Sequence, residues 1–403
     1  MPVSIPEFWK LVAESRLLTG EQCQQLSLNY SQVKGGTADG SAKSLAEWLV
    51  SINTLSKYQA TVLLNGRAGP FFYSDYKVYD RIDSGRFKGF FRAVHAASNH
   101  PVLLQFVTGS AAQDPQQWAY IAAQVQTRLL QPFPHFQRYF EAVDLGAFKF
   151  LVAEDLSGES LADFVKRAGR LSPPDACNAI RQAAVALVEI HRWGLAHGDV
   201  RPANLWVDGV GNVRLLHDPA FLPAPWNPSA EDKNGTLLAR ADYAAPEFAH
   251  PAKLPDSLTD LYALGCSFYH LLAGQPPFEG GDIAQKFQRH QTAPIQPLAP
   301  LGVPEPLGQI VTYLMAKNPA VRFQHAAQVV EQLTSWVEPA RRFPQPIAPA
   351  QTLPMFEKLL QIRRANPATH HAPSAGHPAP GHAAPGHVAP GHVAAGGPPA
   401  GAP

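Results

Sequence analysis

One eight-residue stretch constrains the fold of this 403-residue chain more than any other part of the sequence. It reads His-Gly-Asp-Val-Arg-Pro-Ala-Asn over residues 197–204, and it follows a long apolar run over residues 171–193 whose pattern predicts a buried helix. Asp199 and Asn204 place a carboxylate and an amide five positions apart. Two interpretations are open at this point: a plain polar turn after a helix, or a loop that holds these two side chains for chemistry. The flanking segments decide between them.

Four later segments keep a definite order and spacing relative to this stretch. They lie at residues 213–220, 243–247, 259–265 and 317–322. Together with residues 197–204 they resemble the motifs of the Ser/Thr protein kinases, and the resemblance covers residues 76–337. It implies an α+β, bilobal protein-kinase fold with a small β-rich N-lobe and a larger helical C-lobe.

The resemblance implies a catalytic role for four polar residues of the C-lobe. Asp199 would orient and deprotonate the acceptor hydroxyl, and Arg201, where a Lys is usual, would be the cation on the phosphate side. Asn204 and Asp218 would hold magnesium. Residues of suitable types therefore occupy the C-lobe positions that the family uses for catalysis and for magnesium binding.

Other C-lobe positions have a structural role or differ from the family pattern. Glu247 and Arg322 would form a partly buried ion pair that ties the activation segment to the lobe. Arg240 replaces the Thr that contacts the catalytic Asp, which alters the substrate side. Gly198 replaces the Arg that reads an activation-loop phosphate, so the usual phospho-dependent switch is not expected.

The N-lobe lacks most of the phosphate-binding apparatus of the family. In the glycine-rich hairpin only Gly85 is kept, while Asp83 and Lys88 stand where two other glycines are usual. Gln105 replaces the strand lysine that holds the α- and β-phosphates. Its usual glutamate partner on the next helix is best matched by Gln124, which predicts a pair of amides in place of an ion pair.

The resemblance also marks the positions that would contact a nucleotide. Those positions are Ile82, Gly85, Phe90, Leu103, Gln105, Ala153, Glu154, Leu156 and Trp206. Phe90, Leu103 and Trp206 are each larger than the Val, Ala and Leu that enclose adenine in active kinases. Because interiors are close-packed, the three enlarged side chains predict a pocket filled by the protein itself.

Three functional hypotheses follow from these departures. The first is a pseudokinase, a kinase-fold regulator or interaction scaffold that needs no cofactor. The second is an active ATP-dependent and Mg-dependent Ser/Thr kinase in which Lys88 replaces the missing strand lysine, as in the with-no-lysine kinases. The third is a small-molecule kinase or a sensor of another ligand on the same fold, which the Pro246-Glu247 motif disfavours.

The flanks of the kinase-like region are predicted to differ from it in character. Residues 1–70 read as a small helical module with capping boxes that begin at Thr19, Ser44 and Ser56, and this module resembles the segment before kinase domains of planctomycete proteins. Residues 338–366 read as a linker with a possible short basic helix, and 367–403 as a disordered Pro/Ala/Gly/His-rich tail. Its regular histidines could bind a divalent metal, but they lack acidic or Cys partners.

Composition restricts the partners that the chain is expected to have. The net charge of +1 gives no reason to expect binding to nucleic acid. No signal-peptide pattern and no apolar run of membrane-spanning length is present, so we expect a cytoplasmic protein without membrane insertion. A protein partner or protein substrate is expected from the family resemblance, and nothing in the sequence indicates an oligomeric state.

Overall fold

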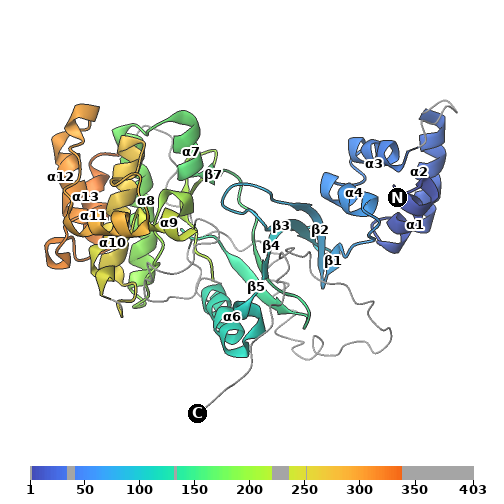
Figure 1. The fold of residues 1–403 in the computed structure, drawn as a ribbon, viewed down its shortest axis with the longest axis horizontal. Helices are drawn as coiled ribbons and strands as arrows, with labels where there is room; N and C mark the ends of the chain where they lie inside the picture. The colour runs from blue at the N-terminus through green and yellow to red at the C-terminus, as the bar shows by residue number, and fades with distance from the viewer. Residues whose placement is uncertain (1, 34–40, 131–133, 220–235, 251, 338–403) are drawn as a thin grey trace, which may run out of the picture. The chain divides into compact units, whose positions relative to one another are not determined.

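A computed structural model describes residues 2–33, 41–130, 134–219, 236–250 and 252–337 of the chain (Figure 1). The predicted linker and tail over 338–366 and 367–403 lie outside these residues. Within them, no helix has both the length and the apolar composition needed to cross a membrane.

Four helices form the N-terminal module around a core of its own. They are α1 (Ile5–Glu14), α2 (Gly20–Val33), α3 (Ala42–Ser51) and α4 (Lys57–Leu64). The reciprocal caps predicted at Thr19 and Ser56 are confirmed. The cap predicted at Ser44 is wrong, because α3 begins one turn earlier and Ser41 Oγ accepts the N–H of Ser44 at 3.2 Å.

The N-lobe is an antiparallel sheet of six strands in the order β1-β2-β3-β4-β6-β5. The strands are β1 (Phe72–Tyr73), β2 (Tyr76–Arg81), β3 (Phe91–His95), β4 (Pro101–Val107), β5 (Tyr139–Asp144) and β6 (Lys149–Glu154). The short α5 (Ser110–Gln113) precedes α6 (Pro115–Leu130), and α6 packs against β5. The residues that begin and end the glycine-rich hairpin therefore belong to neighbouring strands, β2 and β3.

The helical module is attached to the N-lobe through the start of α4. Ser56 Oγ donates to the carbonyl of Tyr79, and the buried Gln59 donates from Nε2 to the carbonyl of Val78 at 2.7 Å. The register of β2 against β3 shifts between Val78 and Asp80, so Tyr79 occupies a bulge. The cap of α4 thus binds strand β2 just before the hairpin begins.

The C-lobe is helical, as the resemblance predicted. Its helices are α7 (Leu161–Ala168), α8 (Pro173–His191), α9 (Thr236–Ala241), α10 (Ser257–Ala273), α11 (Ile283–Thr292), α12 (Glu305–Leu314) and α13 (Ala326–Thr334). A small sheet of β7 (Glu159–Ser160), β8 (Leu205–Val207) and β9 (Val213–Leu215) lies at the lobe boundary. Helix α8 is the predicted buried helix, and α10 and α13 pack against it. The α+β, bilobal fold predicted from the sequence is confirmed.

Arg322 provides the strongest polar attachment inside the C-lobe. Its side chain is fully buried and forms two parallel hydrogen bonds to Glu247, at 2.8 Å and 2.7 Å. It also donates to the carbonyls of Ala316 and Leu258 and lies over the ring of Tyr262. The predicted ion pair is therefore present, with the remaining donors of the guanidinium largely satisfied.

Candidate functional site

The loop that carries Asp199 and Asn204 is held in place by buried contacts from α10. Asp260 of α10 accepts the backbone N–H groups of His197 and Gly198 at 2.7 Å and 2.8 Å. The side chain of Asn204 donates from Nδ2 to the carbonyl oxygen and to Oδ2 of Asp199, both at 2.7 Å. The two residues that the sequence placed five positions apart therefore contact each other directly.

Two arginines share the other carboxylate oxygen of Asp199. The Nε atoms of Arg201 and Arg240 lie 3.0 Å and 3.2 Å from Oδ1. Burial by itself raises the pKa of the Asp199 carboxyl. The guanidinium groups of Arg201 and Arg240, together with His197 and the hydrogen bond from Asn204, outweigh burial, so the pKa lies below its ordinary value. Both carboxylate oxygens are thus engaged by protein donors, which makes Asp199 a weak proton acceptor for a hydroxyl.

Gln105 does not pair with Gln124, so the prediction of an amide pair is wrong. Gln105 donates from Nε2 to Oδ1 of Asp218 at 2.9 Å and accepts at Oε1 from the hydroxyl of Tyr139 at 3.3 Å. Gln124 is only partly buried on α6 and makes no hydrogen bond to Gln105 within the described residues. Gln105 lies opposite Leu151 in the register of β4 on β6, and from this position its amide reaches Asp218.

A residue that the sequence did not single out reaches the predicted metal position. Arg86, in the glycine-rich hairpin, donates from Nε to Oδ1 of Asn204 at 2.7 Å. This is the oxygen of Asn204 that would bind magnesium. The hydrogen bond joins the N-lobe hairpin to the catalytic loop, 118 positions away in sequence.

Apolar side chains gather in the region that the resemblance assigns to adenine. Phe87 of the hairpin is buried, and its ring centroid lies 4.9 Å from that of Trp206 and 5.5 Å from that of Phe90. One hydrophobic cluster contains these rings together with Ile82, Leu103, Ala153, Leu156, Tyr139 and Leu216. The structure thus brings together every apolar residue that the sequence predicted for this pocket and adds Phe87 to them.

The contact of Phe87 with the pocket could not have been predicted from its residue type. The family pattern also has a Phe in this part of the hairpin, so Phe87 does not depart from the pattern. Arg86 occupies a position that varies in the pattern, so its residue type did not indicate a contact with Asn204 either. Only the path of the hairpin places one residue against Asn204 and the next against Trp206.

The hinge between the lobes is also engaged by the protein. Trp206 donates from its indole nitrogen to the carbonyl of Ser157 at 2.9 Å. The carbonyl of Glu154 accepts from Nε2 of Gln137 at 3.0 Å, and the carboxylate of Glu154 pairs with Arg214. Two hinge carbonyls, those of Glu154 and Ser157, therefore already accept hydrogen bonds from the protein.

The remaining hairpin residues face outward. Lys88 and Asp83 are exposed, and Asp83 lies 4.0 Å from Arg81. Lys88 makes no side-chain hydrogen bond or ion pair within the described part of the chain. Gly85 has a φ of +72°, and the added Cβ of another residue would be strained there.

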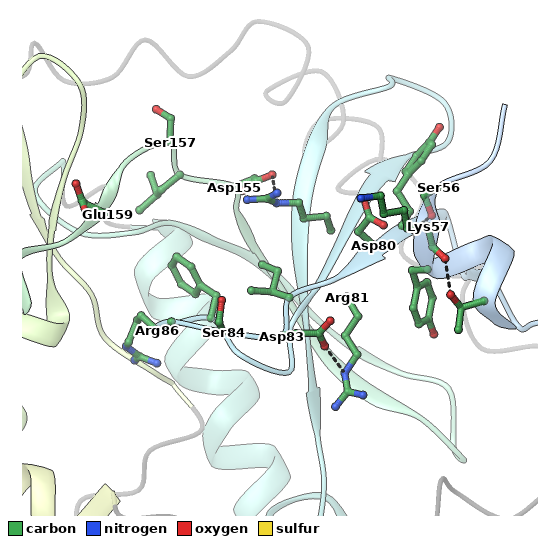
Figure 2. Close-up of a pocket in the computed structure, with 18 of the residues that line it drawn as sticks. Ser56, Lys57, Asp80, Arg81, Asp83, Ser84, Arg86, Asp155, Ser157 and Glu159 are labelled. Carbon is green, nitrogen blue, oxygen red and sulfur yellow. Dashed lines mark hydrogen bonds and ion pairs between the residues drawn. The ribbon is translucent and has the colours of Figure 1, made fainter. Parts of the chain in front are cut away.

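A cleft of about 1170 Å³ opens between the helical module, the hairpin and the hinge (Figure 2), and four of the positions assigned to nucleotide contact line it: Ile82, Gly85, Leu156 and Trp206. Phe87 and Trp206 belong to its lining. Figure 2 shows mainly charged and hydroxyl side chains around it, among them Lys57, Arg81, Asp83, Asp155 and Glu159. The open space of this region is therefore lined by polar side chains together with apolar ones, and it reaches the aromatic cluster at Phe87 and Trp206.

The described residues do not fit a magnesium–nucleotide complex. The rings of Phe87, Phe90 and Trp206 lie together in the region assigned to adenine, and the guanidinium of Arg86 faces Asn204. Asp218 accepts from an uncharged amide, and no group of three His, Cys, Asp or Glu side chains able to hold a metal occurs among the described residues. A divalent cation beside Arg86 would experience charge repulsion.

The bilobal fold, the catalytic loop fixed by α10 and the Glu247–Arg322 pair define a domain of the protein-kinase type. A family model described as "Protein kinase domain" matches residues 76–335, which is more than half of the chain. The protein therefore belongs to the protein kinase family.

Two curated bacterial proteins are similar to this chain. The chain is 27% identical over 262 residues to serine/threonine-protein kinase PknB of Mycobacterium tuberculosis, a match covering 62% of this chain and 42% of that protein. It is 31% identical over 191 residues to a Corynebacterium glutamicum protein named "Probable serine/threonine-protein kinase PknB", covering 46% of this chain and 29% of that protein. The chain thus spans less than half the length of these relatives, and it is similar to bacterial Ser/Thr kinases.

Proposed function

We propose that this protein is a pseudokinase, a kinase-fold regulator or interaction scaffold that acts without binding nucleotide. The observation that carries the proposal is the position of Phe87, which lies between Phe90 and Trp206 in the adenine region. A nucleotide could enter only if this aromatic contact were broken and the cluster were exposed to water. Opening the cluster would therefore cost part of the free energy that stabilises the N-lobe.

The polar contacts support the same proposal. Phosphoryl transfer needs a metal at Asn204 and Asp218 and a carboxylate at Asp199 that can receive a proton. Here Arg86 donates to Asn204, and two guanidinium groups hold the pKa of Asp199 low. Each contact replaces a ligand or substrate by a side chain of the protein.

The alternative is an active Ser/Thr kinase that uses ATP, magnesium and Lys88. Lys88 is exposed in the hairpin, two residues after the Arg86 that reaches the catalytic loop. This function would require the hairpin to move so that Phe87 leaves the pocket. It predicts phosphorylation of Ser or Thr that disappears in both Lys88→Met and Asp199→Asn.

Nucleotide binding by the full chain distinguishes the two functions. We expect ATP with magnesium to leave the melting temperature of the wild type unchanged, because the pocket is filled. A ligand at one hundred times its dissociation constant would add about 2.7 kcal/mol of stability, which a thermal shift assay detects readily. Such a shift in the wild type would refute the nucleotide-independent pseudokinase.

Trp206→Leu is the matched gain-of-binding variant. It shortens one wall of the cluster to the residue type usual in active kinases, so nucleotide binding that appears only in this variant would support a self-filled pocket.

We further propose that the partner is a protein, that the protein acts in the cytoplasm, and that residues 1–70 are a recruitment module of the planctomycete type.

A further inference from the structure

A bulge interrupts strand β2 at the point where the helical module is attached. The register of β2 on β3 pairs Val78 with Ala93 and Asp80 with Arg92, so Tyr79 is the extra residue. A bulge bends its strand, increases the local twist and re-aims the chain that follows it. Here the carbonyl of the extra residue accepts a hydrogen bond from the module, through the Oγ of the helix cap of α4. The module therefore binds β2 at the residue that redirects the strand.

Gln59 joins the start of α4 to the same part of β2. Its side chain is 1% exposed, and its Oε1 accepts the backbone N–H of Ser56 at 3.0 Å. The Nε2 of the same amide donates to the carbonyl of Val78 at 2.7 Å. On β3, the ring of Phe91 lies 5.5 Å from that of Tyr58, centroid to centroid. One amide thus closes the helix cap and binds the strand, so α4 and β2 form one hydrogen-bonded unit.

The glycine-rich hairpin begins shortly after the bulge. The backbone N–H of Ile82 donates to the carbonyl of Phe90 at 2.8 Å, and the carbonyl of Ile82 accepts the N–H of Gly89 at 2.7 Å. These two bonds close the base of the hairpin. The tip beyond them carries Arg86 to the catalytic loop and Phe87 to the aromatic cluster. The path that the bulge gives to β2 therefore sets the position of both side chains.

Open space lies between the tip of the hairpin and the module. The cleft of about 1170 Å³ is lined by Ser84 and Arg86 of the hairpin and by Ser56 and Lys57 at the start of α4 (Figure 2). Within the described residues, no hydrogen bond or ion pair joins the tip to the module. Strand β2 is therefore the polar connection between them, and the cleft offers room for a hairpin that is released.

We propose that the helical module regulates the pocket from within the chain: by binding the bulge of β2, it keeps the hairpin closed over the aromatic cluster. The inference rests on the proposed function, since it concerns what holds the nucleotide region closed. Ser56 and Gln59 each donate to a backbone carbonyl of β2, so the partner that fits this surface is an extended segment of a protein that presents its own carbonyls to them. Such a partner would open the hairpin by binding the released module better than the attached one.

Hydrogen–deuterium exchange of the full chain, followed by mass spectrometry, measures opening of the hairpin. The amides of Ile82, Gly89 and Phe90 are hydrogen-bonded in the closed hairpin and report on it. Gln59→Met keeps the volume of the side chain but removes its hydrogen bond to β2. Exchange over residues 82–90 should then be at least about tenfold faster than in the wild type, because local opening is no longer opposed by the module. Exchange at the wild-type rate would overturn the proposal.

Gln22→Met is the matched control within the module. Gln22 Oε1 accepts the N–H of Thr19 at 2.8 Å in the reciprocal cap of α2, so the substitution removes an equivalent capping amide without touching β2. Exchange over residues 82–90 should stay at the wild-type rate in this variant. Equal acceleration in both glutamine variants would refute the contact with β2 as the link. Phe87→Ala, which removes the anchor of the hairpin itself, gives the rate of an open hairpin.

A second variant and an internal reference guard against loss of the fold. Ser56→Ala removes the other hydrogen bond to β2 with a smaller change in volume, and it should also accelerate exchange over residues 82–90. Residues 173–191, in the buried helix α8, report global unfolding in the same spectra and should keep their rate. Equal acceleration of both segments in both variants would refute a local hold on the hairpin, because the whole domain would then be opening.

The failure of this inference can be told apart from failure of the proposed function. A thermal shift of the wild type by ATP with magnesium refutes the pseudokinase, whatever rate the hairpin shows in the variants. Wild-type exchange over residues 82–90 in both Gln59→Met and Ser56→Ala refutes the regulatory role of the module and leaves the pseudokinase standing.

Discussion

Replacement of Phe87 by Ala tests whether the glycine-rich hairpin is part of the core. In an open nucleotide site this loop would contact solvent, and the substitution would change stability little. Here the side chain of Phe87 is 6% exposed and contacts two aromatic rings. Truncation of a buried Phe costs about 3–5 kcal/mol, and a loop can relax partly into the space, so we expect a loss of about 3 kcal/mol.

Urea denaturation followed by fluorescence measures this loss. The midpoint should fall while the slope with denaturant stays constant, which shows that the change is one of native-state stability. Phe148→Ala is the control, since Phe148 also belongs to the N-lobe but is 44% exposed; it should cost less than about 1 kcal/mol. If Phe87→Ala costs no more than this control, the filled pocket is refuted.

A double-mutant cycle of Phe87 and Trp206 separates the interaction energy between the two rings from the energy that each side chain gains by burial. Aromatic pairs contribute about 0.5–1.5 kcal/mol beyond the area that they bury. We therefore expect Phe87→Ala and Trp206→Leu to be less destabilising together than the sum of the two single changes. Strict additivity would mean that the two rings do not interact in solution.

Three further predictions concern the C-lobe and the hinge. Arg322→Met should lower the free energy of unfolding by about 3–5 kcal/mol in urea denaturation, because it leaves the Glu247 carboxylate without its buried partner. Burial lowers the pKa of His270 to about 4, so stability present above pH 6.5 should be lost as the pH falls toward 4, and His270→Gln should flatten that part of the stability curve measured by melting. Gly158→Ala should be severely destabilising in the same assay, because Gly158 has a φ of +117° and a Cβ would lie 2.1 Å from the carbonyl oxygen of Val207.

Matched controls make these outcomes decisive. Glu14→Gln removes an exposed helical pair with Lys10 and should change stability by less than about 0.5 kcal/mol, so an equally small effect of Arg322→Met would contradict the buried pair. Tyr243→Phe removes the hydroxyl that contacts His270 at 2.7 Å but keeps the buried imidazole. The acid loss of stability should persist in that variant, and its disappearance would mean that burial is not the cause. Gly209→Ala has open space for its Cβ, and a loss as large as that of Gly158→Ala would contradict the steric argument.

The sequence was sufficient for the fold and for the buried ion pair of the C-lobe. The order of its motifs predicted two lobes, and the pair of Glu247 with Arg322 lies where it was expected. This contact is specified by two short motifs, whose residues lie at short helical turns. Such elements repeat their geometry wherever the motif occurs, so residue type alone predicts the contact.

The enlarged pocket residues were also predictable, since size is a property of the amino acid. Phe90, Leu103 and Trp206 belong to one cluster, as their volumes indicated. The sequence could not place Phe87 with them, because its family counterpart is the same residue type. The amide partner of Gln105 was likewise mistaken, since the choice between Gln124 and Asp218 depends on the register of a strand.

The sequence by itself determined that the chain is a protein kinase fold with an altered phosphate apparatus. Only the tertiary structure decided what replaced the missing ligands: Phe87 in the adenine region, Arg86 at Asn204 and Arg240 at Asp199. Phe87 and Arg86 lie in a loop of the N-lobe and contact Trp206 and Asn204, which are more than one hundred positions away in sequence, and no local pattern encodes such a distance. Arg240 lies on α9 in the same lobe as Asp199, and its contact depends on how that helix packs against the catalytic loop.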